Sequence, residues 1–194
     1  MLVIVDYDTG NLCSVENAIG RIGEPYIVSS SPEVIASADY VILPGVGEAS
    51  SAMQKLRDRG LVEVIKSLKC PVLGVCIGLQ LMCESSEEGD AECLGIFPTK
   101  VKRFSAEYGL KVPHMGWNTI EDLRSPLFEG MSEGTYIYYV HSYAPELCDE
   151  AIATTTYGKK FSAAIQKDNF YGTQFHPEKS GEAGEMILKN FLKL

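Results

Sequence analysis

One cysteine stands between two glycines in the segment Gly74-Val75-Cys76-Ile77-Gly78. An apolar run over residues 71–75 precedes it, and a run of helical character over residues 79–83 follows it. Strand, sharp turn and helix are the context in which a glycine-flanked nucleophile is exposed above a sheet, and a helix N-terminus there favours the thiolate. The segment therefore predicts a nucleophilic Cys76. The other interpretation is a buried, unreactive cysteine, and partner residues elsewhere in the chain must decide between the two.

A cysteine nucleophile needs a base, and the chain has histidines only at positions 114, 141 and 176. His176 is the strongest candidate because Glu178 follows two residues later, and alternate residues of an extended segment point to the same side. A carboxylate beside the imidazole would orient it and stabilise its protonated form. Taken alone, this segment would be interpreted as a strand end with a solvated glutamate. Together with the elbow it predicts a triad of Cys76, His176 and Glu178.

The same chemistry requires backbone N–H groups that face the developing oxyanion. Ile77, directly after the nucleophile, can supply one, and the segment Pro44-Gly45-Val46-Gly47 can supply a second from a neighbouring strand end. A plain strand-to-helix turn is an equally compatible interpretation of that segment. Gln80 lies one helical turn after Cys76 and would face the same side, where an amide suits contact with a polar substrate. A surface glutamine is the commoner explanation of Gln80.

The elements that must position these residues are visible in the first half of the chain. Apolar segments alternate with segments of helical periodicity, and the apolar segments are residues 2–6, 26–28, 40–43 and 71–75. This alternation predicts an α/β fold with a parallel sheet covered on both faces, whose sites lie beyond the carboxyl ends of the strands. Cys76 and the glycine-rich turn would then share one edge of the sheet.

The second half of the chain has a different character. Short segments of high β propensity follow a polar loop over residues 84–90, and they cover residues 94–97, 100–104, 136–140, 151–156, 163–166 and 171–175. The segment from Pro113 to Asn118, which holds His114, is expected to be a loop. A final helix is expected over residues 180–192. We expect one domain over residues 1–194, since no linker or repeat interrupts the chain.

Composition restricts the classes of partner. The net charge is −9, which argues against nucleic acid or an anionic membrane as the main partner. No apolar run approaches the 18 residues of a membrane span. The six cysteines contain no Cys-x-x-Cys pair and no zinc-like spacing, so we expect free thiols, a cytoplasmic location and no metal ion or other cofactor.

With these motifs in hand, the chain resembles the class I glutamine amidotransferases over essentially its whole length. The resemblance is carried by the elbow through Gln80 and by Phe175-His176-Pro177-Glu178, in the correct order. More narrowly, the chain is similar to the glutaminase subunits of imidazole glycerol phosphate synthases. That match is carried by the segments at residues 6–12, 44–47, 113–118 and 176–180.

The resemblance implies a flavodoxin-like α/β fold: a mostly parallel sheet flanked by helices, with added antiparallel β elements in the second half. It also implies that Cys76 attacks the side-chain amide of glutamine, that His176 moves the proton, and that water hydrolyses the resulting thioester. Gly47 and Ile77 correspond to the oxyanion hole. Positions corresponding to substrate contacts are Gly45, Val46, Gln80, Glu88, Ser142 and Tyr143.

The partner implied by the resemblance is a (β/α)₈-barrel cyclase subunit, with which the chain would form a heterodimer. Ammonia would pass to that subunit for the synthesis of imidazole glycerol phosphate and an aminoimidazole carboxamide ribotide in histidine biosynthesis. Asn11, Trp117 and Lys179 correspond to interface positions. A free glutaminase would waste glutamine, so we expect low activity alone and strong activation by the partner.

Three other functions remain open at this point. The chain could be the glutaminase of another synthase, such as anthranilate, aminodeoxychorismate or pyridoxal phosphate synthase, or of a carbohydrate-amidating enzyme. It could be a flavodoxin-like redox or stress protein, although the segment around His176 and Glu178 would then have no role. It could be a non-catalytic docking subunit, which would not need all three members of a triad.

Overall fold

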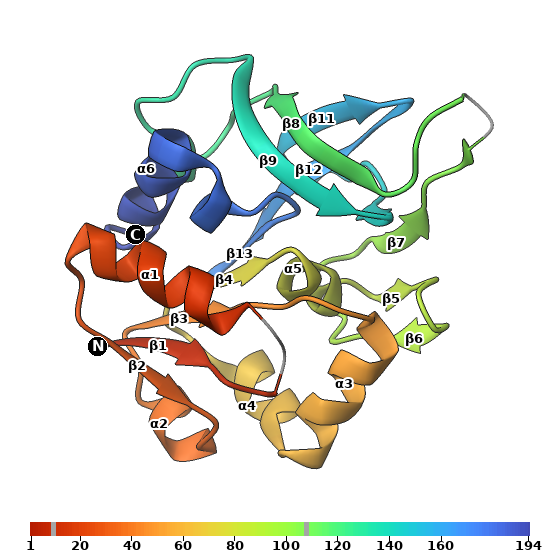
Figure 1. Ribbon diagram of the computed structural model, residues 1–194. Coiled ribbons are helices and arrows are strands. Elements are labelled where there is room, and N and C mark those ends of the chain that lie inside the picture. Colours follow the sequence, from red (N-terminus) through yellow and green to blue (C-terminus); the bar gives the residue numbers. More distant parts are fainter. Residues whose placement is uncertain (9–10, 107–108) are drawn as a thin grey trace.

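A seven-stranded sheet forms the centre of the protein in the computed structural model, which describes residues 1–8, 11–106 and 109–194 (Figure 1). The strand order is β11-β12-β13-β4-β3-β1-β2. Strands β2, β1, β3, β4 and β13 run parallel to one another, whereas β12 pairs antiparallel with β13 and β11 pairs antiparallel with β12. The bounds are β1 Leu2–Val5, β2 Tyr26–Ser29, β3 Tyr40–Leu43, β4 Val72–Val75, β11 Ala151–Tyr157, β12 Lys159–Lys167 and β13 Phe170–Thr173.

The parallel strands are apolar on both faces because helices cover both. Helices α1 and α6 pack on one face, and α2, α3, α4 and α5 lie on the other. The bounds are α1 Leu12–Ile22, α2 Pro32–Ala36, α3 Ala49–Asp58, α4 Leu61–Ser67, α5 Ile77–Met82 and α6 Gly181–Phe191. The predicted α/β class and its helix-covered parallel sheet are therefore confirmed. No helix among the described residues is long and apolar enough to cross a bilayer.

The chain alternates the two faces of the sheet as a buried parallel strand must. In β1, Leu2 and Ile4 belong to the core beneath α1 and α6, while Val3 and Val5 belong to the core beneath α3 and α4. Register is continuous across the centre, with Gly172 of β13 opposite Gly74 of β4. This register brings the carboxyl ends of β3, β4 and β13 to one edge.

Two small sheets complete the second half and lie beside that edge (Figure 1). One has the order β10-β7-β5-β6, and the other is an antiparallel pair of β8 and β9. The bounds are β5 Ser85–Ser86, β6 Ala91–Glu92, β7 Lys100–Arg103, β8 His114–Ile120, β9 Thr135–His141 and β10 Tyr143–Pro145, with short 3₁₀ helices η2 Pro126–Phe128 and η3 Pro177–Lys179. The antiparallel additions predicted for this half are thus present.

Two local predictions are wrong. The segment 113–118, expected to be a loop, is mostly the strand β8, because its backbone pairs with β9 from His114 to Ile120. That pairing is a long-range contact that the glycine and proline content of the segment does not reveal. Residues 94–97 form no strand, since the N–H groups there bond to carbonyls at the end of α5 instead of a neighbouring strand.

Candidate active site

Cys76 occupies a strained turn between β4 and α5. Its backbone has φ 54° and ψ −105°, outside the extended and right-handed helical regions. The Cys76 N–H donates to the Thr173 carbonyl over 2.8 Å, which ties the turn to β13. Glycines are required on both sides: a Cβ on Gly74 would lie 2.7 Å from the Gly78 carbonyl oxygen, and one on Gly78 would lie 1.9 Å from the Leu43 carbonyl oxygen. The turn therefore places the sulfur at the carboxyl edge of the sheet, where Cys76 is only 4% exposed.

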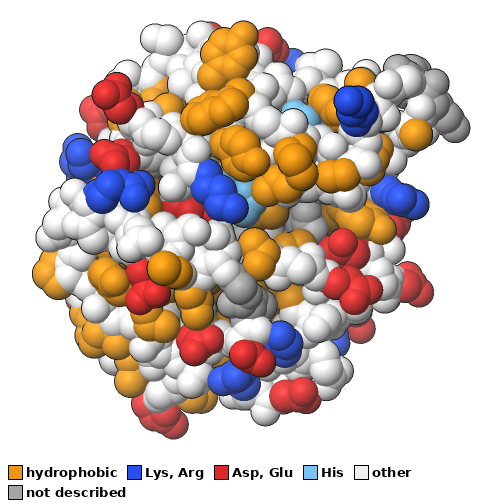
Figure 2. Space-filling view, viewed as in Figure 1, with side chains coloured by type: hydrophobic (Ala, Val, Ile, Leu, Met, Phe, Trp, Pro, Cys, Tyr) orange, Lys and Arg blue, Asp and Glu red, His pale blue; other side chains and the backbone are white. Residues whose placement is uncertain are grey.

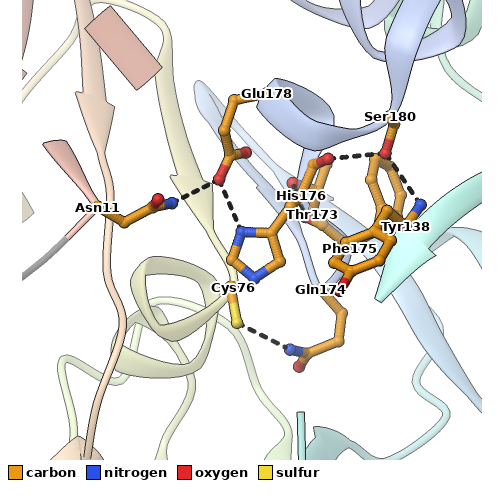
Figure 3. A network of polar contacts seen from close by, with 9 residues as sticks. All are labelled: Asn11, Cys76, Tyr138, Thr173, Gln174, Phe175, His176, Glu178 and Ser180. Atoms are coloured by element: carbon orange, nitrogen blue, oxygen red, sulfur yellow. Dashed lines mark hydrogen bonds and ion pairs between the residues drawn. The ribbon is translucent and has the colours of Figure 1, made fainter. Parts of the chain in front are cut away.

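His176 follows β13, the strand beside β4, and so reaches Cys76 from the neighbouring strand end. Its Nδ1 lies 2.7 Å from Glu178 Oε1, and its ring is directed between Glu178 and the sulfur of Cys76 (Figure 3). The contact arises differently from the prediction. Pro177–Lys179 form the 3₁₀ helix η3, so the carboxylate reaches the imidazole through a tight turn instead of along an extended strand.

The imidazole and its carboxylate are shielded from water. The side chains of His176 and Glu178 are each 1% exposed. Burial lowers the pKa of His176, but the interactions with the Cys76 thiolate and the Glu178 carboxylate outweigh it and raise the pKa to about 10. Within the described chain, Nε2 of His176 has no hydrogen-bond partner. The ring can therefore take the thiol proton and remain as an imidazolium beside the sulfur.

The turn that carries the His176 imidazole is hydrogen-bonded to β9. The His176 N–H donates to the Tyr138 carbonyl over 3.0 Å, and the Tyr138 N–H donates to Ser180 Oγ over 3.0 Å. Ser180 Oγ in turn donates to the His176 carbonyl over 2.7 Å (Figure 3). These bonds fix both ends of the segment that carries Glu178, so the orientation of the imidazole depends on the position of β9.

A cavity of about 320 Å³ opens beside the sulfur, a size at the lower end of small-molecule sites. It joins residues from the carboxyl ends of β3 and β4 with residues between β9 and β10. Among the residues expected from the sequence, its lining includes Val46, Gly47, Cys76, Ile77, Gln80, Glu88, Ser142, Tyr143 and His176. Gly45 does not line it, because a Cβ there would meet Tyr7 Oη at 2.7 Å and Ile77 Cβ at 2.9 Å.

Two backbone segments can present N–H groups to an oxyanion in this cavity. Ile77 is the first residue of α5, where helical N–H groups have no partner inside the helix. Gly47 has φ 104°, a conformation that only glycine adopts readily, and its Cβ position is open. Ile77 follows the end of β4 and Gly47 follows the end of β3, and these two strands are adjacent in the sheet.

Polar side chains with free capacity also face the cavity. Glu88 is half-buried, burial raises its pKa, and its Oε2 accepts the N–H of Ala49 at the start of α3 over 3.0 Å. Gln80 is 1% exposed, and its Oε1 has no partner among the described residues. Both donors of Gln80 Nε2 are used, on the carbonyl of Tyr143 and on Gln174 Oε1, each over 3.0 Å. Only acceptor groups of Glu88 and Gln80 remain for a ligand.

Two polar residues of this site were not among those predicted, and neither were Pro113 and Val140 of the cavity lining. Gln174 is fully buried, and its Nε2 lies 3.6 Å from Cys76 Sγ (Figure 3). Its place two residues before His176 was the available signal, because alternate residues near a strand end share a side. His141 lines the cavity from the end of β9. Its sequence neighbourhood contains no comparable signal, since its partner is on another strand.

Two of the three residues expected at an interface are exposed. Trp117 is 55% exposed on β8, its ring packs edge-on against Tyr138, and Lys179 is exposed after the triad. Figure 2 shows hydrophobic side chains in a band over β8 and β9, where Met115 and Tyr136 are also exposed. Asn11 differs from the others, because its Nδ2 donates to Glu178 Oε1 over 2.6 Å. The part of the first loop at residues 9 and 10 lies outside the described residues.

Comparison with known proteins agrees with the motifs. The family described as glutamine amidotransferase class-I matches residues 3–194. A protein of Bacteroides fragilis, named imidazole glycerol phosphate synthase subunit HisH, is 53% identical over 194 residues, covering 100% of this chain and 99% of the relative. A protein of Yersinia pestis with the same name is 48% identical over 195 residues, again covering 100% and 99%.

Solved structures show the same fold at much lower identity. A glutamine amidotransferase from Thermotoga maritima superimposes with a TM-score of 0.66 at 16% identity, covering 99% of this chain and 82% of that one. The glutaminase domain of CTPS from Trypanosoma brucei, with bound acivicin, superimposes with a TM-score of 0.67 at 14% identity, covering 99% and 93%.

Proposed function

Because this chain belongs to the class I glutamine amidotransferase family, we propose that it hydrolyses glutamine and supplies the ammonia to an imidazole glycerol phosphate synthase. The observation that carries the hydrolysis is the line of Cys76, His176 and Glu178 at the edge of one cavity, with the His176 Nδ1 to Glu178 Oε1 distance of 2.7 Å. The choice of synthase is supported by identities of 53% and 48% over the full chain to subunits of that name.

In the first half of the reaction, Cys76 Sγ attacks the side-chain amide carbon of glutamine. His176 takes the thiol proton and delivers it to the departing nitrogen, so ammonia leaves and a γ-glutamyl thioester remains on the sulfur. The tetrahedral oxyanion is stabilised by the N–H of Ile77 and by a backbone N–H at Gly47. Glu178 holds the imidazole in the tautomer with its proton on Nδ1 and stabilises the imidazolium.

In the second half, water attacks the thioester and His176 accepts its proton. The products are glutamate and the free thiol, so one glutamine and one water give one glutamate and one ammonia. Glu88 pairs with the α-ammonium group of the substrate, and the unpartnered Oε1 of Gln80 accepts a further substrate N–H. Val46, Ser142 and Tyr143 form the walls of the cavity.

The acceptor of ammonia is a (β/α)₈-barrel cyclase subunit that docks on the face carrying Trp117, Lys179 and Asn11. Exposed aromatic and methionine side chains on β8 and β9 suit such an interface, since these residue types are enriched at interface cores. The complex makes imidazole glycerol phosphate and the aminoimidazole carboxamide ribotide of histidine biosynthesis. A biosynthetic enzyme with six free cysteines fits the cytoplasm.

The test is glutamate release from glutamine by this chain alone, with a matching barrel cyclase and its ribotide ligand, and again with Cys76→Ala. We expect little turnover alone, strong turnover with the cyclase, and none in the variant. Turnover that does not change when the cyclase is added would indicate that the chain serves another synthase. Absence of turnover under every condition would reject the glutaminase and favour a docking subunit.

A further inference from the structure

Two buried histidines outside Cys76, His176 and Glu178 contact each other at the cavity, where His141 is part of the lining and His114 is not. His114 is the first residue of β8 and His141 is the last of β9, and the two are directly opposed across the strand pair. Nδ1 of His114 lies 2.9 Å from Nε2 of His141. The residues are 3% and 6% exposed. Buried polar atoms cost free energy unless they are paired, so the remaining nitrogen of each ring needs a partner.

The hydrogen bonds around the pair have one consistent direction. Nδ1 of His141 lies 2.8 Å from the carbonyl oxygen of Tyr143, which can only accept, so the His141 proton is on Nδ1 and its Nε2 accepts. His114 must then donate from Nδ1, which leaves its Nε2 to accept from Asn118 Nδ2 over 3.3 Å. The Asn118 amide is held in this orientation because Nδ2 also donates to the Thr156 carbonyl over 3.1 Å.

Aromatic rings hold the pair in place and keep it neutral. His114 is sandwiched between Tyr157 and Tyr139, with ring centroids 3.9 Å and 4.7 Å away, and Phe104 meets His141 edge-on at 5.2 Å. Burial lowers the pKa of His114 to about 4 and that of His141 to about 3. At neutral pH each ring therefore carries one proton, as the direction of the bonds requires.

The carbonyl at the end of this series is part of the cavity wall. Tyr143 lines the cavity, and its carbonyl accepts a second bond from Gln80 Nε2 over 3.0 Å, so both lone pairs are used. Gln80 Nε2 also donates to Gln174 Oε1, and Nε2 of Gln174 lies 3.6 Å from Cys76 Sγ. The position of one carbonyl thus depends on the histidines on one side and on the Gln80 amide on the other.

We propose that His114 and His141 are positioning residues. Their rings form a series of hydrogen bonds, here called the relay, that begins at Asn118 and ends at the Tyr143 carbonyl. The relay holds that carbonyl, and with it the Ser142–Tyr143 wall of the substrate cavity, in place. Neither ring exchanges a proton with substrate. The relay rests on the proposed function only in that the cavity is taken to bind glutamine.

The kinetic test compares two substitutions at His114, which lies outside the cavity lining. His114→Phe keeps a ring between the two tyrosines but removes the donor to His141, whereas His114→Asn loses the ring but retains a donor near the position of Nδ1. Each is assayed in complex with the barrel cyclase. For His114→Phe we expect KM for glutamine to rise about tenfold, the cost of one buried hydrogen bond, with a smaller change in kcat. For His114→Asn we expect a smaller rise in KM.

A ring that serves only for packing predicts the opposite order, with His114→Asn the more impaired, and that order would overturn the relay. Equal KM values in both variants and the parent would overturn it as well. Two reagents that alkylate Cys76 distinguish an effect on the cavity wall from an effect on the reactivity of the nucleophile. We expect a chloroketone analogue of glutamine to label His114→Phe more slowly than the parent, while iodoacetamide, which needs no wall, labels both at the same rate. Equal slowing by both reagents contradicts a role in positioning the wall.

A spectroscopic test does not depend on turnover. The chain has three histidines, so ¹⁵N-histidine labelling gives three ring systems, and His176→Ala removes one for assignment. At pH 7 we expect both remaining rings to be neutral with the proton on Nδ1. A proton on Nε2 of either ring, or an imidazolium, would contradict the relay. If this signature is present and glutamine is not hydrolysed, the relay stands and the proposed function fails.

Discussion

Asn11 donates from Nδ2 to Glu178 Oε1 over 2.6 Å, the same carboxylate oxygen that lies 2.7 Å from His176 Nδ1. Oε1 of Glu178 therefore has two hydrogen-bond partners. Oε2 is buried and has no hydrogen-bond partner among the described residues. Asn11 itself has φ 75° at the start of α1, and its partner Glu178 directly precedes the exposed Lys179. If the proposed partner docks on the face that carries Trp117 and Lys179, Asn11 would connect it to Glu178.

Removal of this donor tests whether it orients the triad. For Asn11→Ala we expect kcat of the complex to fall about tenfold with little change in KM, because the loss of one bond to a charged group acts on the imidazole and not on substrate binding. Asn17→Ala, on the same helix, removes only an exposed contact with Cys13 and should behave as the parent. Equal kinetics of Asn11→Ala and Asn17→Ala would show that the donor has no such role.

Gln174 is expected to affect the reactivity of the nucleophile. Gln174→Glu replaces a donor beside Cys76 Sγ with a group that carries negative charge when ionised, and like charges disfavour the thiolate. We expect iodoacetamide to alkylate Cys76 at least several-fold more slowly in Gln174→Glu than in Gln174→Leu. Gln54→Glu on α3 adds the same charge at the surface and serves as the control. Faster alkylation of the Gln174→Glu variant would contradict this role of Gln174.

The elbow glycine is tested by stability. A Cβ on Gly78 would overlap the Leu43 carbonyl oxygen at 1.9 Å, so Gly78→Ala should lower the free energy of unfolding by about 3 kcal/mol or prevent folding. Gly20→Ala is the matched control in helix α1, where a Cβ meets nothing within 4 Å, and it should raise that free energy by about 0.5–1 kcal/mol. Urea unfolding measures both. A neutral Gly78→Ala would mean that β3 and α5 separate readily.

The buried histidine pair predicts a loss of stability in mild acid. In the unfolded chain these rings titrate near pH 6.5, whereas in the folded protein the pKa values of His114 and His141 are about 4 and about 3. Below pH 6.5 the unfolded state therefore binds more protons, and the free energy of unfolding falls as the pH falls, by up to about 2.7 kcal/mol per pH unit for two rings. Urea midpoints at pH 7, 6 and 5 give the slope. His114→Phe should give about half of it, and an unchanged slope in that variant would exclude the pair as its source.

The fold and the proximity of Cys76, His176 and Glu178 could be predicted because both follow from short local segments of the sequence. The parallel sheet follows from short apolar segments between helical ones, and Cys76 stands in a strand–turn–helix segment with glycines where Leu43 leaves no room for a side chain. His176 and Glu178 are two residues apart, so their contact did not depend on knowing the fold, although the extended geometry expected for it was wrong.

What could not be predicted depends on pairing between distant strands. The segment at residues 113–118 was expected to be a loop because nothing in it shows that β9 lies opposite. Without that pairing, His114 and His141 remain two isolated histidines, and Gln80 remains a helix residue with no known partner. His114 and His141 are 27 positions apart in the sequence, and Gln80 and Gln174 are 94 positions apart. Only the tertiary structure brings them together.

The most direct test of the central claim is to observe the γ-glutamyl thioester on Cys76. The complex with the barrel cyclase is mixed with glutamine, quenched in acid during turnover, digested and examined by mass spectrometry. We predict a γ-glutamyl group on the peptide that contains Cys76, which accumulates during turnover and is absent from Cys76→Ala. Glutamate release without any such adduct, or an adduct on a different cysteine, would contradict the proposed nucleophile.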